Sequence, residues 1–420
     1  MAEQLHKRFA NEQVRELLEK YINKKIELKY VLDILGIKRR RFFKLLQEYR
    51  KDPSSFSIAY VREKRTRGIK KEIERNILKE LHLEKKLIEN KEIPVWRYNY
   101  SYIKDQIWEK YQQKVSLPTI INRAKKYDFY LDKPERKAHD REVLTNYPGQ
   151  LIQHDSSYHR WSPYADEKWY LITSLDDYSR MLLYAELVEK ELSWEHILAL
   201  ESVFLRYGLP LNYYVDSHRI FRFVQGRDSF WRKHLKVTDE AEPQWKQVLT
   251  DCSVKVIYAL SPQSKGKMER PYGWLQDRIV RTCAREGIRE INQCREVLKY
   301  EVEQYNNYRL HSTTGEIPSI RFNRALSENK SLFRTFVVPL PYQSTKDIFC
   351  LRANRIVNSY RKISFNNMEI KVHGVAIGDT INLRIVPDKN TGLAEIRLWC
   401  NNKLVGTLTL KNDDLNLVHF

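Results

Sequence analysis

Residues 151–158 read LIQHDSSY, a strand-like run with an acidic residue, Asp155, inside it. It is the first of five strand-like runs on which the prediction of the fold rests. Four similar runs follow along the chain: WYLITSLDD (169–177), MLLYAELVEK (181–190), LNYYVDS (211–217) and VKVIYAL (254–260). The first three follow one another as hairpin strands do, and the later two alternate with helical patterns. The helical patterns lie at 194–207, 269–285 and 292–308. This order predicts an α/β domain with a mixed five-stranded sheet and helices on both faces.

Three acidic residues stand inside or at the ends of these elements. Asp155 lies in the first run, Asp216 closes LNYYVDS, and Glu269 begins a helix. A carboxylate in a buried strand costs desolvation energy unless it is paired or bound to a metal. Two strand ends and a helix start can converge on one point, where three carboxylates suit Mg²⁺ or Mn²⁺. Each acid taken alone would more often be a structural residue at a turn or a helix end.

The charge of the chain indicates a polyanionic partner. The 420 residues include 74 Lys+Arg and 54 Asp+Glu, a formal net charge of +20. Residues 1–141 contain 36 of the basic and 21 of the acidic residues, an excess of 36 − 21 = 15. Basic side chains replace the counterions condensed on a nucleic-acid backbone, so this bias favours DNA binding at one end of the chain. A merely basic, soluble surface would not explain the concentration at that end.

The first 60 residues predict a helix-turn-helix domain. Two helical patterns precede Gly36, and KRRRFFKLLQEYRK (38–51) follows it. The last helix is expected to bury Phe42, Leu45, Leu46 and Tyr49 and to present its basic first turn to a DNA groove. The residues of that turn are Lys38, Arg39, Arg40 and Arg41. A nuclear-localisation run or a solvated helix face is the alternative interpretation.

Residues 61–139 predict a second helix-turn-helix domain that begins with the basic linker VREKRTRG (61–68). Its helices are expected at about 70–89, 100–111 and 116–127, with Ser116 as an N-cap. Arg123, Lys125 and Lys126 make the last helix basic and are its candidate DNA contacts. The linker fits a minor-groove contact or a plain solvated connection.

After the α/β domain (140–330), residues 345–420 alternate in a two-residue period and predict a small all-β barrel, with a sandwich as the alternative. The five cysteines are scattered and form no CxxC pair, which indicates reduced, mostly buried thiols. No run approaches the roughly 18 apolar residues of a membrane span, and the first residues lack the apolar core of a secretory signal. We therefore expect a cytoplasmic protein without a membrane partner.

Three blocks of sequence resemble the retroviral-integrase-like catalytic core of bacterial insertion-sequence DDE transposases. They are QHDSS (153–157), VDSHRIF (215–221) and SPQSKGKMERPYGWLQDRI (261–279), and YNNYRLHSTTGEIPS (305–319) resembles the segment after that core. The resemblance implies an RNase H-like fold in which Asp155, Asp216 and Glu269 bind two Mg²⁺ or Mn²⁺ ions. Such ions, about 3.5–4 Å apart, activate the attacking water or hydroxyl and stabilise the leaving oxygen.

The resemblance also implies the partners and the reaction. The protein would bind terminal inverted repeats and target DNA as a homodimer or higher oligomer, hydrolyse the element's ends and join the 3′-OH to target DNA. It would act at the bacterial nucleoid. A basic loop beside the triad would hold the terminal phosphates. The residues of that loop are Gln263, Lys265, Lys267 and Arg270.

The sequence departs from the family pattern at three points. Ser217-His218 follows the second Asp where Asn-Gly is commoner, and Pro271 stands two residues after Glu269. The interval from Asp216 to Glu269 is 269 − 216 = 53 residues, longer than usual in the family, and we assign the extra length to residues 225–243. These changes bear on DNA contacts around Asp216 rather than on the three ligands.

Several side chains have more ordinary interpretations. His218 fits a loop residue better than a substrate contact. Asp176 and Asp177, between two apolar runs, fit a β-turn better than further metal ligands. The tryptophans fit core positions better than base-stacking positions. They are Trp161, Trp169, Trp194, Trp231, Trp245 and Trp274. The alternatives for the whole protein are a DNA-binding protein with an inactive core, a nuclease without strand transfer and a structural chromatin protein.

Overall fold

The computed structural model describes residues 5–59, 68–131, 145–216, 218, 220–221, 242–259 and 266–415, without the side chains of 266–269. By its internal contacts the chain divides into two compact units, Met1–Glu74 and Arg75–Phe420. We describe each unit by itself. The four domain ranges expected from the sequence are finer than this division, and their boundaries stay a prediction.

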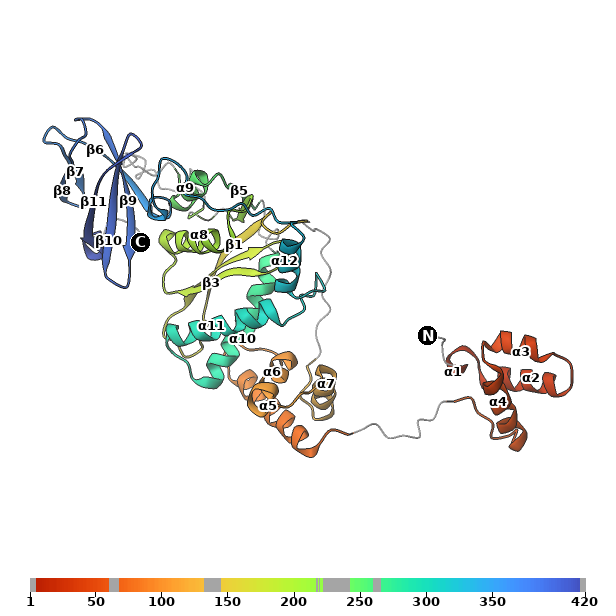
Figure 1. The fold of residues 1–420 in the computed structure, drawn as a ribbon. Helices are drawn as coiled ribbons and strands as arrows, with labels where there is room; N and C mark the ends of the chain where they lie inside the picture. The colour runs from red at the N-terminus through yellow and green to blue at the C-terminus, as the bar shows by residue number, and fades with distance from the viewer. Residues whose placement is uncertain are drawn as a thin grey trace, which may run out of the picture. The chain divides into compact units, whose positions relative to one another are not determined.

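The first unit is helical (Figure 1). Its helices are α1 (Leu5–Arg8), α2 (Asn11–Ile22), α3 (Leu28–Leu35) and α4 (Arg39–Lys51). Gly36 ends α3 in the left-handed region, at φ 62°, where glycine carries no Cβ penalty. The apolar faces of α2, α3 and α4 pack together, and Phe42, Leu45, Leu46 and Tyr49 are buried as expected. The helices and the turn predicted from the sequence are therefore present.

Three further helices follow, α5 (Lys71–Glu89), α6 (Tyr100–Tyr111) and α7 (Leu117–Lys126), and all but the first four residues of α5 belong to the second unit. The first and last residues of these helices differ by at most one position from those that the sequence predicts. The hydroxyl of Ser116 caps α7 by accepting a hydrogen bond from the Thr119 backbone, at 3.4 Å. Asn99 caps α6 in the same way through Tyr102, at 3.0 Å.

A mixed five-stranded sheet forms the centre of the second unit, as predicted. Its strands are β1 (Ile152–His159), β2 (Trp169–Asp176), β3 (Leu182–Val188), β4 (Asn212–Val215) and β5 (Lys255–Tyr258). They lie in the order β3-β2-β1-β4-β5. β1, β2 and β3 pair antiparallel, whereas β1, β4 and β5 pair parallel. The change from antiparallel to parallel pairing occurs at β1, the strand that carries Asp155.

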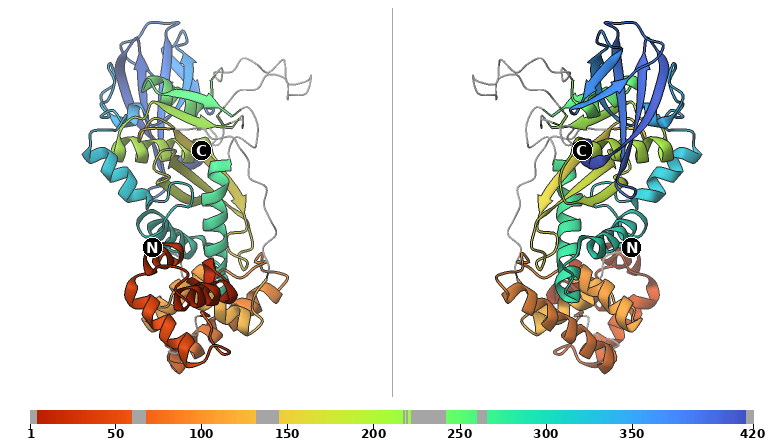
Figure 2. Two further views of the ribbon diagram at one scale, coloured as in Figure 1. Left: turned by 90° about the vertical axis from the view of Figure 1, so that its right-hand side faces the viewer. Right: turned by 90° about the vertical axis from the view of Figure 1, so that its left-hand side faces the viewer.

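Helices cover both faces of this sheet (Figure 2). Helices α8 (Ser193–Tyr207) and α9 (Gln244–Asp251) pack on one face, and α10 (Gly266–Glu286) and α11 (Ile291–Asn307) pack on the other. Buried Trp161, Trp169, Trp194 and Trp245 belong to these cores, as predicted, while Trp231 lies outside the described residues. The sequence analysis did not predict α9 or α12 (Pro318–Ser327).

The C-terminal region consists of antiparallel strands. They are β6 (Leu351–Ile356), β7 (Lys362–Phe365), β8 (Met368–Lys371), β9 (Thr380–Asp388), β10 (Leu393–Cys400) and β11 (Lys403–Lys411). One sheet has the order β11-β10-β9-β6, and β7-β8 forms a separate hairpin. The all-β character is as expected, whereas closure into a barrel stays a prediction. All five cysteines are free and buried, which confirms the expectation of reduced thiols.

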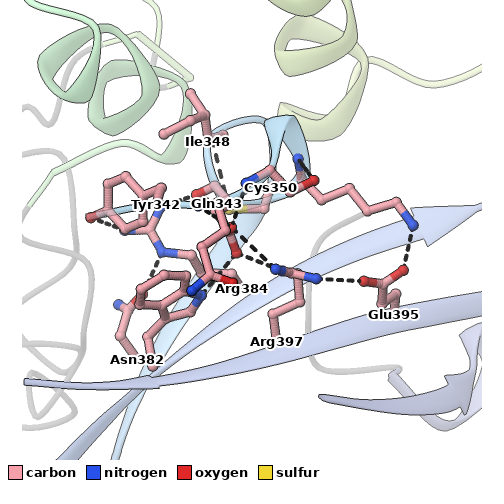
Figure 3. Close-up of polar contacts among 12 residues, drawn as sticks. Tyr342, Gln343, Ile348, Cys350, Asn382, Arg384, Glu395 and Arg397 are labelled. Atoms are coloured by element: carbon pink, nitrogen blue, oxygen red, sulfur yellow. Dashed lines mark hydrogen bonds and ion pairs between the residues drawn. The ribbon is translucent and has the colours of Figure 1, made fainter. Parts of the chain in front are cut away.

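Polar contacts hold the segment before β6 against the C-terminal sheet (Figure 3). The carboxylate of Asp347 accepts hydrogen bonds from Arg397 Nε at 2.6 Å and from Trp399 Nε1 at 2.8 Å. The guanidinium of Arg384 lies over the Tyr342 ring, 4.0 Å from its centroid. Asp251, at the end of α9, pairs with Arg352 at 2.9 Å. Helix α9 therefore anchors the C-terminal sheet as well as covering the central one.

Candidate functional site

Two of the three candidate acids lie on neighbouring parallel strands. The register pairs Ile152 with Tyr213 and Gln153 with Tyr214, an offset of 213 − 152 = 61 residues. Continued by two residues, the same offset brings Asp155 level with Asp216, because 216 − 155 = 61. Both residues are half-buried. Asp216 follows the last residue of β4, and its Oδ1 accepts a hydrogen bond from the His218 backbone at 2.9 Å.

Tyr272, a buried residue of α10, is affected by the charges of carboxylates near Asp155 and Asp216. The hydroxyl of Tyr272 accepts a hydrogen bond from Thr173 Oγ1 at 2.8 Å, and Thr173 pairs with Asp155 across β1 and β2. Burial first, and then the charges of Asp155, Glu191 and Asp216, raise the pKa of Tyr272 well above its ordinary value. The charges of three carboxylates thus act on one hydroxyl. This agrees with a position of Asp155 and Asp216 in the same region of the sheet.

The third candidate acid lies at the beginning of the helix that carries Tyr272. Helix α10 begins at Gly266, so residue 269 stands in its first turn and three residues before Tyr272. Residues three apart share a helix face. The side chain of Glu269 lies outside the described residues, so its part in the site stays a prediction. The sequence placed Pro271 in the first turn of a helix beginning at Glu269, but α10 begins at Gly266, so Pro271 is its sixth residue and lies inside the helix, where it has no N–H for the helical hydrogen-bond ladder.

A chain of buried polar side chains lies behind Asp155. His154 connects Ser174 Oγ, at 2.9 Å, with His196 Nδ1, at 2.8 Å. His196 Nε2 continues to Glu191 Oε1 at 3.3 Å, and Ser156 also donates a hydrogen bond to Glu191. Burial by itself raises the pKa of Glu191, but the hydrogen bonds from His196 and Ser156 outweigh it and lower that pKa. Glu191 is therefore held ionised next to the strand that carries Asp155.

The sequence analysis missed Glu191, His196 and Tyr272. Glu191 lies between β3 and α8, at a position where charged residues ordinarily face solvent. No spacing in the sequence connects it with Ser156, 191 − 156 = 35 residues earlier. Of these three residues, Tyr272 could have been found from the sequence, because it stands three residues after Glu269 and therefore shares its helix face.

Asp176 and Asp177 form the turn that the sequence predicts. Asp176 Oδ2 accepts hydrogen bonds from the Ser179 backbone at 2.9 Å and from its hydroxyl at 2.6 Å. Asp177 Oδ1 pairs with Arg180 at 2.8 Å. Burial raises the pKa of Asp176 to about 6, although these hydrogen bonds oppose the shift. Both acids are used in ordering the β2–β3 connection, which confirms the structural interpretation.

The candidate DNA contacts differ in how the structure describes them. Lys38, Arg39, Arg40 and Arg41 are exposed at the beginning of α4. On α7, Lys125 and Lys126 are exposed and Arg123 is half-buried. Arg270 is exposed and donates a hydrogen bond to Thr313. Gln263 and Lys265 lie outside the described residues, as does the side chain of Lys267.

The donor set fits a divalent, oxygen-preferring cation. Asp155 and Asp216 supply carboxylate oxygens from adjacent strands, the ligands that Mg²⁺ and Mn²⁺ favour. Within the part of the chain that the structure describes, no group of three or more His, Cys, Asp or Glu side chains is arranged to hold a metal. The side chain of Glu269 is not in that part. A complete ligand set therefore depends on the third acid.

Comparisons with known proteins give the class. No family model matches the chain. A Sinorhizobium fredii protein that carries the name transposase y4bF is 26% identical over 238 residues, 57% of this chain and 47% of that protein. The transposase for insertion sequence IS1202 of Streptococcus pneumoniae is 24% identical over 239 residues, 57% of this chain and 45% of that protein. These relatives confirm the resemblance to insertion-sequence transposases, and the chain spans about half of their length.

Similar solved structures are retroviral integrases. The catalytic core of BIV integrase is 16% identical, with a TM-score of 0.31, and the match covers 43% of this chain and 98% of that one. The HTLV-2 integrase core, described as a complex with magnesium, is 16% identical, with a TM-score of 0.31, over 41% of this chain and 95% of that one. A simian T-cell lymphotropic virus intasome is 13% identical, with a TM-score of 0.34, over 71% and 91%.

Among the described residues, no helix is both long and apolar enough to cross a lipid bilayer.

Proposed function

We propose that the protein is a DDE transposase that cuts the ends of a mobile DNA element and joins them to target DNA. The observation that carries this proposal is the register of β1 and β4, in which one offset brings Asp155 level with Asp216. The charges of both acids at the Tyr272 hydroxyl support the same point of convergence. The curated relatives, named transposases, support the reaction class.

In the proposed site, Asp155, Asp216 and Glu269 hold the metal. Two bound divalent ions supply activation of the attacking water or hydroxyl and stabilisation of the leaving oxygen. The protein orients these ligands. Glu191 holds Ser156 beside Asp155, and the His218 backbone holds Asp216 in its turn. Thr173 and Tyr272 pack α10 against the sheet and exclude water behind the carboxylates.

The proposed DNA contacts are the exposed basic side chains on two helical regions and beside the site. The first turn of α4, with Lys38 to Arg41, and the last turn of α7 would read the terminal inverted repeats. Gln263, Lys265, Lys267 and Arg270 would hold the terminal phosphates. Because two ends must be joined in one reaction, the working form on DNA would be at least a dimer. Cytoplasmic, nucleoid-associated action follows from a DNA substrate.

An assay of cutting and strand transfer tests the proposal. Labelled duplexes with the element's terminal repeats are incubated with Mg²⁺ or Mn²⁺ and with the parent protein, Glu269→Gln or Glu286→Gln. Glu286, exposed at the end of α10, provides a matched control on the same helix. We expect metal-dependent joining by the parent and by Glu286→Gln, and none by Glu269→Gln. Binding without cutting by all three proteins would instead favour a DNA-binding protein with an inactive core.

A further inference from the structure

One face of α10 is built from arginine. Arg278, Arg281 and Arg285 are spaced by three and four residues, so they share a side of the helix. The side chains of Arg278 and Arg281 are each 1% exposed, and that of Arg285 is 7% exposed. Buried arginine cannot lose its charge in a protein and therefore requires acidic partners. These partners do not come from the central sheet.

Helix α5 supplies acids to two of these arginines. Arg281 pairs with Glu84, and Arg285 pairs with Glu84 at 2.9 Å and with Glu80 at 2.6 Å. Both glutamate side chains are 0% exposed. Burial raises the pKa of Glu84, although the charges of Arg281 and Arg285 oppose the shift. Loss of one partner within this packed contact would leave a buried charge unpaired, so each side depends on the other.

Helix α6 and the segment before it complete the contact. Arg278 pairs with Asp105 on α6 and with Glu301 on α11, the latter at 2.7 Å. The Tyr102 hydroxyl lies 2.8 Å from Thr282 Oγ1, and its ring packs beneath Arg278 and Arg285. An apolar cluster lies alongside these polar contacts and joins residues of the α5–α6 region to α10. Its buried members are Leu87, Ile93, Val95, Val280 and Ala284.

Helix α7 is attached to the same group. Tyr100 on α6 donates a hydrogen bond to the Phe129 backbone, just after α7, at 2.9 Å. Asn76 on α5 donates one to Gln113, before α7, at 3.0 Å. The exposed Lys125 and Lys126 of α7 are therefore fixed, through α5 and α6, to the arginine face of α10.

The arginine face and the candidate site share one helix. Residue 269 precedes Arg278 by nine residues, or about 14 Å along an α-helix at 1.5 Å per residue. We propose that Arg278, Arg281 and Arg285 are positioning residues that hold helices α5–α7 at a fixed distance from the carboxylate site. The protein would thereby set the spacing between the DNA segment held by α7 and the phosphodiester that is cut. This inference rests on the proposed function.

The position of the cut tests this role. Arg281→Lys keeps the charge but removes the forked guanidinium that pairs with two partners, and Glu84→Gln removes the charge with little change in shape. The matched control is Arg324→Lys, at an exposed pair with Glu316 in which the arginine side chain is 49% exposed. Cut ends are mapped to single nucleotides on terminal-repeat DNA, and the Kd for that DNA is measured in parallel.

The parent and Arg324→Lys should cut at one position, whereas Arg281→Lys and Glu84→Gln should cut at two or more neighbouring positions with a Kd within about twofold of the parent. A residue that only supports folding would lower the yield without moving the cut. A single, unchanged cut position in both variants would overturn the proposal. Arg285→Lys provides a milder substitution if either variant fails to fold, as judged by circular dichroism.

A distance measurement separates this inference from the proposed function. All five native cysteines are buried, so spin labels can be directed to exposed positions through Asn122→Cys on α7 and Lys190→Cys beside Glu191. A narrow distance distribution that broadens with Arg281→Lys supports a fixed attachment, and a broad one in the parent overturns it. A narrow distribution in a protein that cuts no DNA would overturn the proposed function while supporting the fixed attachment.

Discussion

The two basic helical regions differ in where their charges lie. In the first, residues 5–59, the core is formed by apolar side chains, and the basic turn of α4 is exposed. In the second, α5–α7, two glutamates of α5 are wholly buried and pair with arginines of α10. The first region is thus held together by its own apolar core, whereas the second is completed by the part of the chain that carries the central sheet.

This difference changes what the net charge of +20 means. Exposed lysine and arginine attract a polyanion, but Arg278, Arg281 and Arg285 are buried and neutralised by acids. Arg352 and Arg384, at the junction with the C-terminal sheet, are likewise buried and pair with Asp251. Similar residue types therefore form the proposed DNA contacts in one region and an internal attachment in another.

The largest effect is expected at the carboxylate site of the central sheet, which lies outside both helical regions. Asp155→Asn should lower cutting at least about 100-fold, the upper range for loss of a mere supporting contact, while the Kd for end DNA stays within about twofold. Asp166→Asn, an exposed acid near the same strand, is the control and should cut normally. Cutting by Asp155→Asn at the parent rate would refute the metal assignment. Gel-based cutting and binding assays measure both quantities.

Two truncations test whether the two helical regions depend differently on the rest of the chain. Removal of residues 1–67 should leave the melting temperature of the remainder within about 2 °C, because the first unit has its own core. Removal of residues 1–140 should lower it by more than about 10 °C or prevent folding, because it also exposes the apolar side of α10 that packs against α5 and the segment after it. Circular-dichroism melting distinguishes the two, and equal melting temperatures would contradict the attachment.

Single arginines should show the same contrast in opposite assays. Arg281→Ala should lower the free energy of unfolding by about 3–5 kcal/mol, as for a broken buried pair. Arg40→Ala, on exposed α4, should change it by less than about 0.5 kcal/mol. In DNA binding, Arg40→Ala should reduce the affinity and the steepness of its salt dependence. Urea unfolding and binding titrations at several salt concentrations test the pair, and a large stability loss in Arg40→Ala would be contrary to it.

The pH dependence of stability should have opposite signs in the two regions. Hydrogen bonds from Ser54 and Ser55 lower the pKa of Asp52 to about 2, so its contribution is present above about 4 and is lost as the pH falls towards 2. Burial raises the pKa of Glu84, so its contribution is present at low pH and declines as the pH rises above its unfolded value. Unfolding measured from pH 2 to 7 in Asp52→Asn and Glu84→Gln should remove these opposite slopes. Slopes of the same sign would count against the assignment.

The smallest effects should come from the helix caps. Ser116 caps α7, and its replacement by Ala should lower the free energy of unfolding by about 1 kcal/mol. Helix α2 has Ala10 at its N-cap, without a side-chain hydrogen bond, and Ala10→Ser should stabilise the first unit by a similar amount. Denaturant unfolding of each variant checks both, and destabilisation by Ala10→Ser would show that the α2 cap is already satisfied.

Most helices and strands, and their order, could be predicted from local sequence patterns. Apolar spacing predicted α2–α8 and the strands of the central sheet, because a helix or strand buries one face and the period of that face is local. Gly36 and Ser116 marked a helix end and a helix start through backbone preferences that are equally local. Asp155 and Asp216 were detectable because carboxylates are rare in buried strands. Helices α9 and α12 were missed, since they are short, with 8 and 10 residues.

Which charged side chains pair with one another is visible only in the tertiary structure. The pairing of Glu84 with Arg281 joins residues 281 − 84 = 197 positions apart, and the contact of Glu191 with Ser156 joins a loop to a strand. No local pattern distinguishes Glu84 or Arg281 from the many solvated acids and arginines on helices, because the electrostatic cost that pairs them arises only on burial. The same holds for Asp155 and Asp216. Their residue types come from the sequence, but their position at one level comes from the parallel pairing of β1 with β4.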